Sequence, residues 1–222
     1  QVLARAEALA LPSVQRSLDV PYEMLLVGVG GTGVVTVARA IAMAAHLDGR
    51  AVSVLDFTGF AQKGGAVLSH VRLAGAAAAL HQHRIDIGGA DLLLAADLVV
   101  ASEDDALATL RPNKTVVIAN SALTQTGAML RNTQLGVETD AIQAFLKQKV
   151  GAGHFHSLDA GELANTLVSP MQANMLLLGY AWQKGTVPVS LPALKKAIDL
   201  AGSAAANHLA FAWGRLWAQD SA

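Results

Sequence analysis

The chain has 222 residues, of which 53% are hydrophobic and 15% charged, with a formal net charge of −1 and no cysteine. This length fits one α/β domain with a helical addition. The near-neutral charge argues against a nucleic-acid-binding surface, and the lack of cysteine excludes disulfides, thiolate nucleophiles and cysteine-held iron–sulfur clusters from this segment.

The hydrophobic residues are mostly Ala, Leu and Val, because aromatic residues make up only 5%. The chain is more apolar than an average soluble domain, so we expect other domains or subunits to cover part of its surface in an oligomer. No run reaches the roughly 18 uncharged apolar residues of a membrane span, and no signal-peptide pattern opens the chain. We therefore expect a cytoplasmic protein. Because the first residue is Gln1, not Met, we also expect that the chain is cut from a longer protein.

The N-terminal part predicts a short helix and then the start of an α/β domain. Residues 1–21 are expected to form an amphipathic helix that ends before Pro12, followed by a linker. The apolar run Met24–Val27 is typical of a strand buried on both faces. The Ala-rich segment Val34–Leu47 predicts a buried helix.

A glycine cluster joins this strand to this helix. Gly28, Gly30 and Gly33 have the spacing of a dinucleotide-binding turn, and Asp56 ends the next strand-like run. Asp56 would contact a ribose hydroxyl or else accept backbone N–H groups of its own loop. The turn itself has two interpretations: a nicotinamide or flavin site, or a tight turn that serves packing and holds no dinucleotide. We favour the second.

The middle of the chain predicts alternating strands, loops and short helices. Strands are expected at 51–55 and 66–73, on either side of a loop at 56–65. The further expected elements are a short helix at 89–96, a core strand at 98–102, an acidic-started helix stopped by Pro112, a strand at 115–119, a long surface loop at 121–136, a helix capped by Thr139 or Asp140, and a strand at 153–158.

The remaining residues predict helices only. Asp159 begins a short helix, Ser169 with Pro170 begins a longer one that ends at Gly185, Ser190 caps a third, and 204–219 forms the last. The predicted fold is α/β: a Rossmann-like three-layer domain over 22–222 with a mostly parallel sheet and a C-terminal helical layer at 159–219.

The loop after the second strand carries candidate binding residues. Thr58, Gln62 and Lys63 follow a core strand, at the edge where open α/β sheets usually bind ligands. Lys63 can meet a phosphate or carboxylate as a compact point charge. The alternative is a solvated lysine on a loop shaped by Gly64 and Gly65.

Histidine and tryptophan residues give weaker signals. The pairs His81/His83 and His154/His156 would share a face on a strand and could bind a metal, but no third ligand is positioned by the sequence, so we expect no metal site. We expect His70 to be a packed or surface residue rather than a general base. Trp182, Trp213 and Trp217 are expected to anchor the helical layer or an interdomain contact.

Three stretches carry a family resemblance: GVGGTGVVTVARAIAMAAHLDG from Gly28, VSVLDFTGFAQKGGAVLSHVRLA from Val52, and AFAWGRLWAQD from Ala210. Over roughly residues 22–220 the sequence resembles the gamma domain of 2-oxoacid:ferredoxin oxidoreductases of the pyruvate/ketoisovalerate type. Within that family it looks most like the C-terminal region of the fused indolepyruvate ferredoxin oxidoreductases. Gamma domains commonly have Arg-Gly-Gly where this chain has Lys63-Gly64-Gly65, and the lysine favours the fused branch.

The resemblance implies thiamine-dependent oxidative decarboxylation of a 2-oxoacid, such as indolepyruvate, to an acyl-CoA, with electrons passing through iron–sulfur clusters to ferredoxin. Family members bind thiamine diphosphate and Mg²⁺ through a Gly-Asp-Gly segment followed by Asn, which this chain lacks. The implied role is therefore a non-redox domain that forms a wall of the active site and contacts coenzyme A, while other domains hold thiamine diphosphate, Mg²⁺ and the clusters.

Two alternatives stay open: a free-standing Rossmann-type dinucleotide-binding protein, and an assembly domain without ligand contacts. No catalytic residue is expected in this chain. The candidate cofactor-binding residues are Gly28, Gly30, Gly31, Thr32, Gly33, Thr58, Gln62, Lys63, Gly64 and Gly65.

Overall fold

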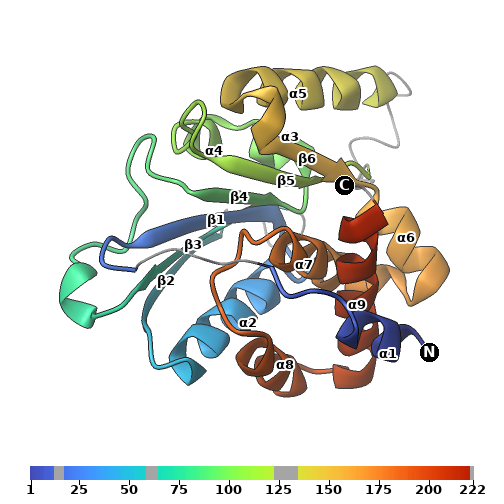
Figure 1. Ribbon diagram of the computed structural model, residues 1–222. Helices are drawn as coiled ribbons and strands as arrows, with labels where there is room; N and C mark the ends of the chain where they lie inside the picture. Colours follow the sequence, from blue (N-terminus) through green and yellow to red (C-terminus); the bar gives the residue numbers. More distant parts are fainter. Residues whose placement is uncertain (13–17, 59–64, 123–134, 221–222) are drawn as a thin grey trace.

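The computed structural model describes residues 1–12, 18–58, 65–122 and 135–220. These residues form a six-stranded sheet between two layers of helices (Figure 1), so the predicted α/β architecture is confirmed. The strands, in their order across the sheet, are β2 (Ala51–Thr58), β3 (Ala66–Ala74), β1 (Tyr22–Val29), β4 (Leu92–Ala95), β5 (Val116–Asn120) and β6 (Phe155–Leu158).

One layer of helices contains α2, α7, α8 and α9, and the other contains α3, α4 and α5 (Figure 1). The α-helices are α1 (Val2–Glu7), α2 (Val34–Leu47), α3 (Leu98–Ala101), α4 (Asp104–Leu107), α5 (Leu135–Val150), α6 (Ala160–Leu167), α7 (Ala173–Gln183), α8 (Leu191–Asp199) and α9 (Ala204–Asp220). Short 3₁₀ helices are η1 (Ala77–Ala79), η3 (Ala152–His154) and η4 (Pro170–Gln172). None of the described helices is long and apolar enough to cross a membrane.

The sheet is parallel except for β3, which runs antiparallel to both of its neighbours. In register, Val27 of β1 lies between Leu68 of β3 and Ala95 of β4. The strand β3 separates β2 from β1, so the residues that follow these two strands are not direct neighbours in the sheet. Neighbouring strands lie about 4.8 Å apart, so the ends of β1 and β2 are about 10 Å apart in the sheet.

Both faces of the sheet are buried, which explains the apolar runs in its central strands. In β1, Leu26 packs into the core under α2, α7 and α8, whereas Leu25 and Val27 pack into the core under α3, α4 and α5. All three side chains are at most 1% exposed.

The sequence prediction was wrong over residues 89–102, where it placed a helix and then a strand. The structure has the reverse order, strand β4 followed by helix α3. Leu92–Ala95 pairs with β1 on one side and β5 on the other. Asp97 then ends the strand and starts α3, because its carboxylate accepts the N–H of Val100 at 3.0 Å. Such an N-cap is a common helix start.

Two elements were also predicted to be shorter than they are. The strand β2 continues to Thr58, three residues past the predicted Leu55, because its last residues keep pairing with β3. The helix α5 begins at Leu135, so neither Thr139 nor Asp140 is its cap. Most of the loop predicted at 121–136 lies outside the described residues.

The helices α7 and α9 cross with their backbones almost in contact (Figure 1). A Cβ added to Gly214 would lie 1.9 Å from the carbonyl oxygen of Leu176, and one added to Gly179 would lie 2.1 Å from that of Phe211. Only glycine permits this approach, because every other residue carries a Cβ.

The N-terminal helix α1 packs against α9 through Ala6, Ala212 and Leu216. Beside it, Arg215 is 1% exposed, stacks over Trp182 at 5.0 Å, and donates from Nε to Gln183 Oε1 at 2.9 Å. Gln183 in turn donates to the carbonyl of Ala10 at 2.7 Å. Trp182 therefore does anchor the helical layer, as predicted, whereas Trp217 is 39% exposed.

A loop, not a helix, covers part of the β2–β3 region on the α5 side of the sheet. Ile85 from this loop is buried, and its N–H donates to His70 Nδ1 at 3.2 Å. The ring of Phe57 meets the His70 ring edge-on at 5.4 Å. His70 is 2% exposed, so it is packed, and burial together with the nearby Arg84 charge lowers its pKa to about 4.

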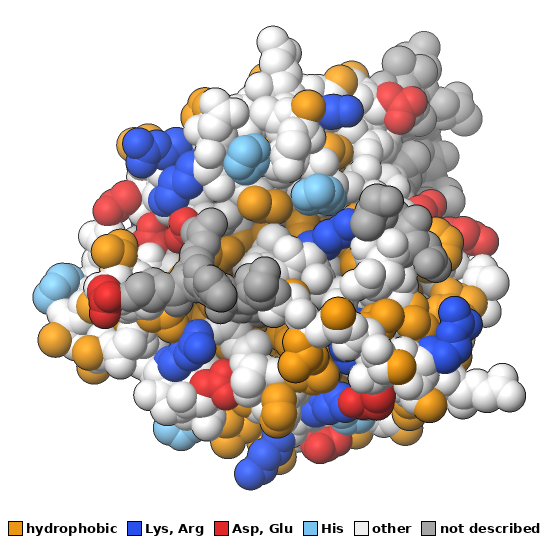
Figure 2. Space-filling view, viewed as in Figure 1, with side chains coloured by type: hydrophobic (Ala, Val, Ile, Leu, Met, Phe, Trp, Pro, Cys, Tyr) orange, Lys and Arg blue, Asp and Glu red, His pale blue; other side chains and the backbone are white. Residues whose placement is uncertain are grey.

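Space-filling shows charges of both signs interspersed with hydrophobic side chains over the visible face (Figure 2). This face therefore presents no single-sign field of the kind that binds nucleic acid.

The crossing of α7 and α9 predicts a strong effect of a single methyl group. We expect Gly214→Ala to lower the free energy of unfolding by about 3 kcal/mol, because the added Cβ forces two backbones apart. Chemical denaturation measures it. Gly153→Ala is the matched control, since an added Cβ there meets nothing within 4 Å, and it should shift stability by less than about 0.5 kcal/mol. An equal, small effect of both variants would contradict the packing argument.

The buried His70 predicts a pH dependence of stability. Its pKa in the folded chain, about 4, lies below the ordinary value of 6.5, so unfolding takes up a proton between these two pH values. Stability should fall as the pH drops from 6.5 to 4. His70→Gln should show a shallower fall over this window in denaturation curves, whatever its stability at pH 7. His81→Gln, which removes an exposed histidine, is the control; a wild-type slope in the His70 variant would refute the assignment.

Candidate functional site

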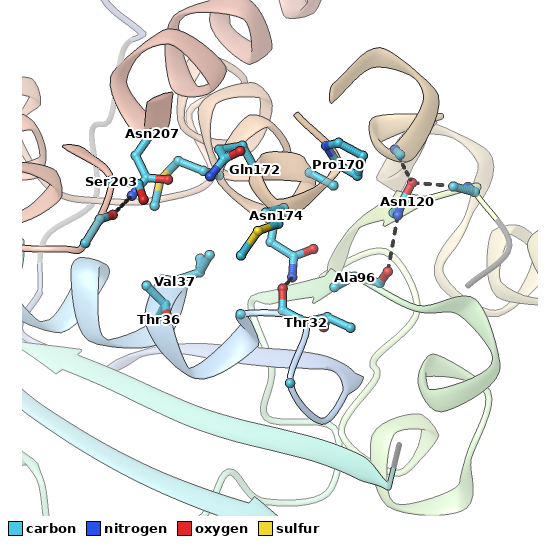
Figure 3. Close-up of a pocket in the computed structure, with 18 residues that line it drawn as sticks. Thr32, Thr36, Val37, Ala96, Asn120, Pro170, Gln172, Asn174, Ser203 and Asn207 are labelled. Atoms are coloured by element: carbon cyan, nitrogen blue, oxygen red, sulfur yellow. Dashed lines mark hydrogen bonds between the residues drawn. The ribbon is translucent and has the colours of Figure 1, made fainter. Parts of the chain in front are cut away.

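A cavity of about 650 Å³ opens at the carboxyl edge of the sheet (Figure 3). The start of α2 forms one wall, and the ends of β4 and β5 form the floor. The starts of α6, α7 and α9 form the other walls. Its volume is in the range of small-molecule sites, and its position is where open α/β sheets bind ligands.

The predicted glycine turn lies at this cavity, and each glycine in it has a separate reason. A Cβ on Gly28 would lie 2.7 Å from Val34 and 3.0 Å from Ala96, so this glycine lets α2 and the end of β4 pack closely. Gly31 and Gly33 have φ values of +87° and +95°, which favour glycine. Gly31, Thr32 and Gly33 line the cavity. Gly28 is thus a packing residue, and the later part of the turn faces the cavity.

The turn is held against the helical layer by one polar contact. Asn174, at the start of α7, donates from Nδ2 to the carbonyl of Thr32 at 2.8 Å (Figure 3). The hydroxyl of Thr32 donates to the carbonyl of Val29 at 2.7 Å, which closes the turn from inside. Residues 142 positions apart therefore fix the shape of this wall.

Asn120 organises the opposite wall. Its Oδ1 accepts the N–H groups of Ala122 at 3.1 Å, Ala160 at 3.0 Å and Gly161 at 3.4 Å, and its Nδ2 donates to the carbonyl of Ala96 at 3.3 Å. One carboxamide thus joins β4, β5 and the first turn of α6.

The structure brings together two of the predicted site segments. Gly30 donates its N–H to the carbonyl of Gly65 at 2.8 Å, so the end of the 58–65 loop meets the glycine turn. Thr58 is the last residue of β2 and is exposed. Gln62, Lys63 and Gly64 lie outside the described residues.

Asp56 is not placed to share a ligand with the glycine turn. It lies on β2, which β3 separates from β1, whereas the acidic residue of a dinucleotide site lies on the strand next to the turn. Its carboxylate accepts the hydroxyl of Ser69 at 2.6 Å. The ribose interpretation of Asp56 is therefore wrong for a ligand held at this turn. The sequence argument for a dinucleotide site then rests on the glycine spacing alone.

The histidine pairs have separate surroundings. His83 Nδ1 lies 2.7 Å from the hydroxyl of Ser53. Burial lowers the pKa of His156, and the nearby charges of Lys184 and His154 lower it further. Within the described part of the chain, no three His, Asp or Glu side chains gather in a way that could hold a metal.

Sequence reasoning missed most of the side chains around the cavity. The polar lining residues that it did not single out are Thr36, Asn120, Gln172, Asn174, Ser203 and Asn207. Asn120 had a readable signal, because it directly follows the apolar run 116–119 and so stands at a strand end. Among the residues that the structure describes, the lining includes no Asp, Glu, His, Lys or Arg.

Comparisons with known proteins agree with this geometry. The family described as pyruvate ferredoxin/flavodoxin oxidoreductase matches residues 23–217. The indolepyruvate oxidoreductase subunit IorB of Archaeoglobus fulgidus is 29% identical over 175 residues, which cover 79% of this chain and 83% of that protein.

Two solved structures share the fold. The gamma subunit of a keto/oxoacid ferredoxin oxidoreductase from Geobacter sulfurreducens has a TM-score of 0.62 and 22% identity, and the match covers 90% of this chain and 99% of that one. The 2-oxoglutarate:ferredoxin oxidoreductase of Magnetococcus marinus, solved with 2-oxoglutarate, coenzyme A and succinyl-CoA bound, has a TM-score of 0.67 and 16% identity, covering 93% of this chain and 32% of that one.

The family match spans both the glycine turn and the helices that complete the cavity, and it confirms the resemblance found in the sequence. The chain belongs to the pyruvate ferredoxin/flavodoxin oxidoreductase family.

Proposed function

We propose that this chain is the non-redox gamma component of a thiamine-dependent 2-oxoacid:ferredoxin oxidoreductase of the indolepyruvate type. The whole enzyme would oxidatively decarboxylate a 2-oxoacid to an acyl-CoA and pass the electrons to ferredoxin. The observation that carries the proposal is the family match over residues 23–217, together with the similarity to IorB.

The chemistry of the chain supports the division of labour. It contains no cysteine that could hold an iron–sulfur cluster, and no Gly-Asp-Gly segment of the thiamine-binding type. Thiamine diphosphate, Mg²⁺ and the clusters would therefore belong to other domains or subunits, which would be the partners of this chain in an oligomer.

The contribution of this chain would be a binding wall at the carboxyl edge of its sheet. The glycine turn and the end of the 58–65 loop meet there through the Gly30–Gly65 bond. Lys63, two residues before Gly65, would then reach a phosphate of coenzyme A or the carboxylate of the 2-oxoacid. The coenzyme A bound in the Magnetococcus enzyme makes this ligand the first to test.

The division of labour predicts that activity needs both components. The purified chain should not reduce a dye with any 2-oxoacid, even with thiamine diphosphate and coenzyme A present. Indolepyruvate-dependent reduction should appear when the thiamine- and cluster-bearing component is added. The measurement is dye reduction at increasing ratios of the two components. Turnover by this chain alone, or by the other component at the full rate, would refute the proposal.

Lys63→Ala should lower kcat/KM of the assembled enzyme for coenzyme A or for indolepyruvate about tenfold, as expected for one lost charge-assisted contact. The melting temperature is expected to stay the same, because the sequence predicts a solvated lysine in this loop and solvated charges contribute little to stability. Lys147→Ala, on the exposed side of α5, is the matched control and should leave the kinetics as they are. Wild-type kinetics of the Lys63 variant would reduce this loop to a connector.

A further inference from the structure

The two edges of the sheet differ in how they are protected against pairing with another chain. The strand β6 at one edge has four residues, whereas β2 at the other edge has eight (Figure 1). An edge strand presents unpaired N–H and C=O groups, and proteins usually protect it by keeping it short or by placing proline, lysine or a β-bulge in it. The strand β6 is short in this way, and β2 is not.

The strand β2 has none of the other protective features either. Its sequence, AVSVLDFT, contains no proline or lysine, and Asp56 is its only charged residue. All eight residues pair with β3 in one unbroken register, so no bulge turns the edge away. Over the described ranges of the chain, only β3 forms backbone hydrogen bonds with β2. The outer edge of β2 can therefore pair with a further strand.

The strand that fits this edge best is β2 of a second copy. Around a two-fold axis perpendicular to the sheet, two β2 strands pair antiparallel, and the same face of each sheet stays on the same side. With Val54 opposite Val54, residues 51–57 of the two copies overlap completely. The second copy thus offers a strand of the right length and direction that is already extended.

Side-chain sizes are complementary in this register. On the face that His70 occupies, Phe57 would lie opposite Ala51. On the same face, Leu55 would lie opposite Ser53. Each large side chain therefore meets a small one, and the ring of Phe57, which is 43% exposed at the end of the strand, gains a neighbour.

The opposite face of β2 also fits a second copy. Val52 and Val54 pack against the core beneath α2, and Val54 would meet its own counterpart at the two-fold axis. Pairs of β-branched residues across two strands are favourable. Asp56 would lie opposite Val52, so the pairing opposes no like charges. A centre at Asp56 would instead bring two carboxylates together, which is unfavourable.

We propose that this chain forms a two-fold dimer in which the two β2 strands pair antiparallel around Val54 and join the two six-stranded sheets into one continuous sheet. The contact uses no residue that lines the cavity, because the described lining contains none from β2. The inference goes beyond the proposed function and does not depend on it, since it concerns the contact between two copies of this chain.

Single cysteines test the pairing, because the chain has no cysteine of its own. Residues directly opposite each other in an antiparallel pair have Cα atoms about 4.5–5.5 Å apart, within the range of a disulfide. Val54→Cys should therefore give a disulfide-linked dimer under mild oxidation, read on a non-reducing gel. Leu55→Cys is the matched control from the same strand. Its two copies would be diagonal neighbours about 7–8 Å apart, too far for a disulfide.

A charge at the axis tests the same contact in solution. Sedimentation velocity over a dilution series should show a reversible dimer of the wild type, because an interface built on one strand pair is small. Val54→Asp places two carboxylates opposite each other and should raise the dissociation constant of the dimer at least tenfold. Gln148→Glu adds the same charge on the exposed side of α5 and should sediment as the wild type does.

Three outcomes would overturn the inference. The first is a wild-type monomer at every dilution, including the case in which β2 pairs with the thiamine-bearing component instead. The second is equal disulfide formation by Val54→Cys and Leu55→Cys, which would indicate random collision. The third is a dimer that Val54→Asp does not weaken. Should Val54→Asp fail to fold, the two cysteine variants still decide the question, because each replaces one apolar side chain by another of smaller size.

Discussion

The geometry of the cavity depends on the crossing of α7 and α9 at Gly179 and Gly214. This contact fixes two helices whose starts form separate walls of the cavity. Gln172 and Asn174 lie at the start of α7, and Ser203 lies directly before α9. The bond from Asn174 to Thr32 then sets the glycine turn against the same helical layer. A packing constraint between two buried helices thus positions polar groups that do not themselves touch the crossing.

The sequence predicted the elements whose signals are local and failed where distant pairing decides. The helix Val34–Leu47 was placed correctly, because a glycine turn precedes it and Gly49 follows it closely. Over 89–102 two short apolar runs follow each other, and such runs are ambiguous between strand and helix. Pairing of Leu92–Ala95 with β1 and β5 resolves the ambiguity, and the capping contact of Asp97 then starts α3.

The candidate site was predictable to the extent that it is a backbone feature. A turn with left-handed residues needs glycine, so Gly31 and Gly33 appear in the sequence as a cluster. Gln172, Ser203 and Asn207 have no such pattern, because what brings them together is tertiary structure. The insertion of β3 between β1 and β2 is equally invisible to spacing, and it changes what Asp56 can reach.

The described residues that line the cavity carry no ionisable side chain, and this affects how they respond to pH. Peptide and carboxamide dipoles neither gain nor lose protons while the chain is folded, so these residues contribute the same electrostatic potential at every such pH. Any variation of occupancy with pH would then follow the protonation of the occupant or of groups outside this lining. A kinetic pH profile of the assembled enzyme would accordingly contain no ionisation contributed by these lining residues.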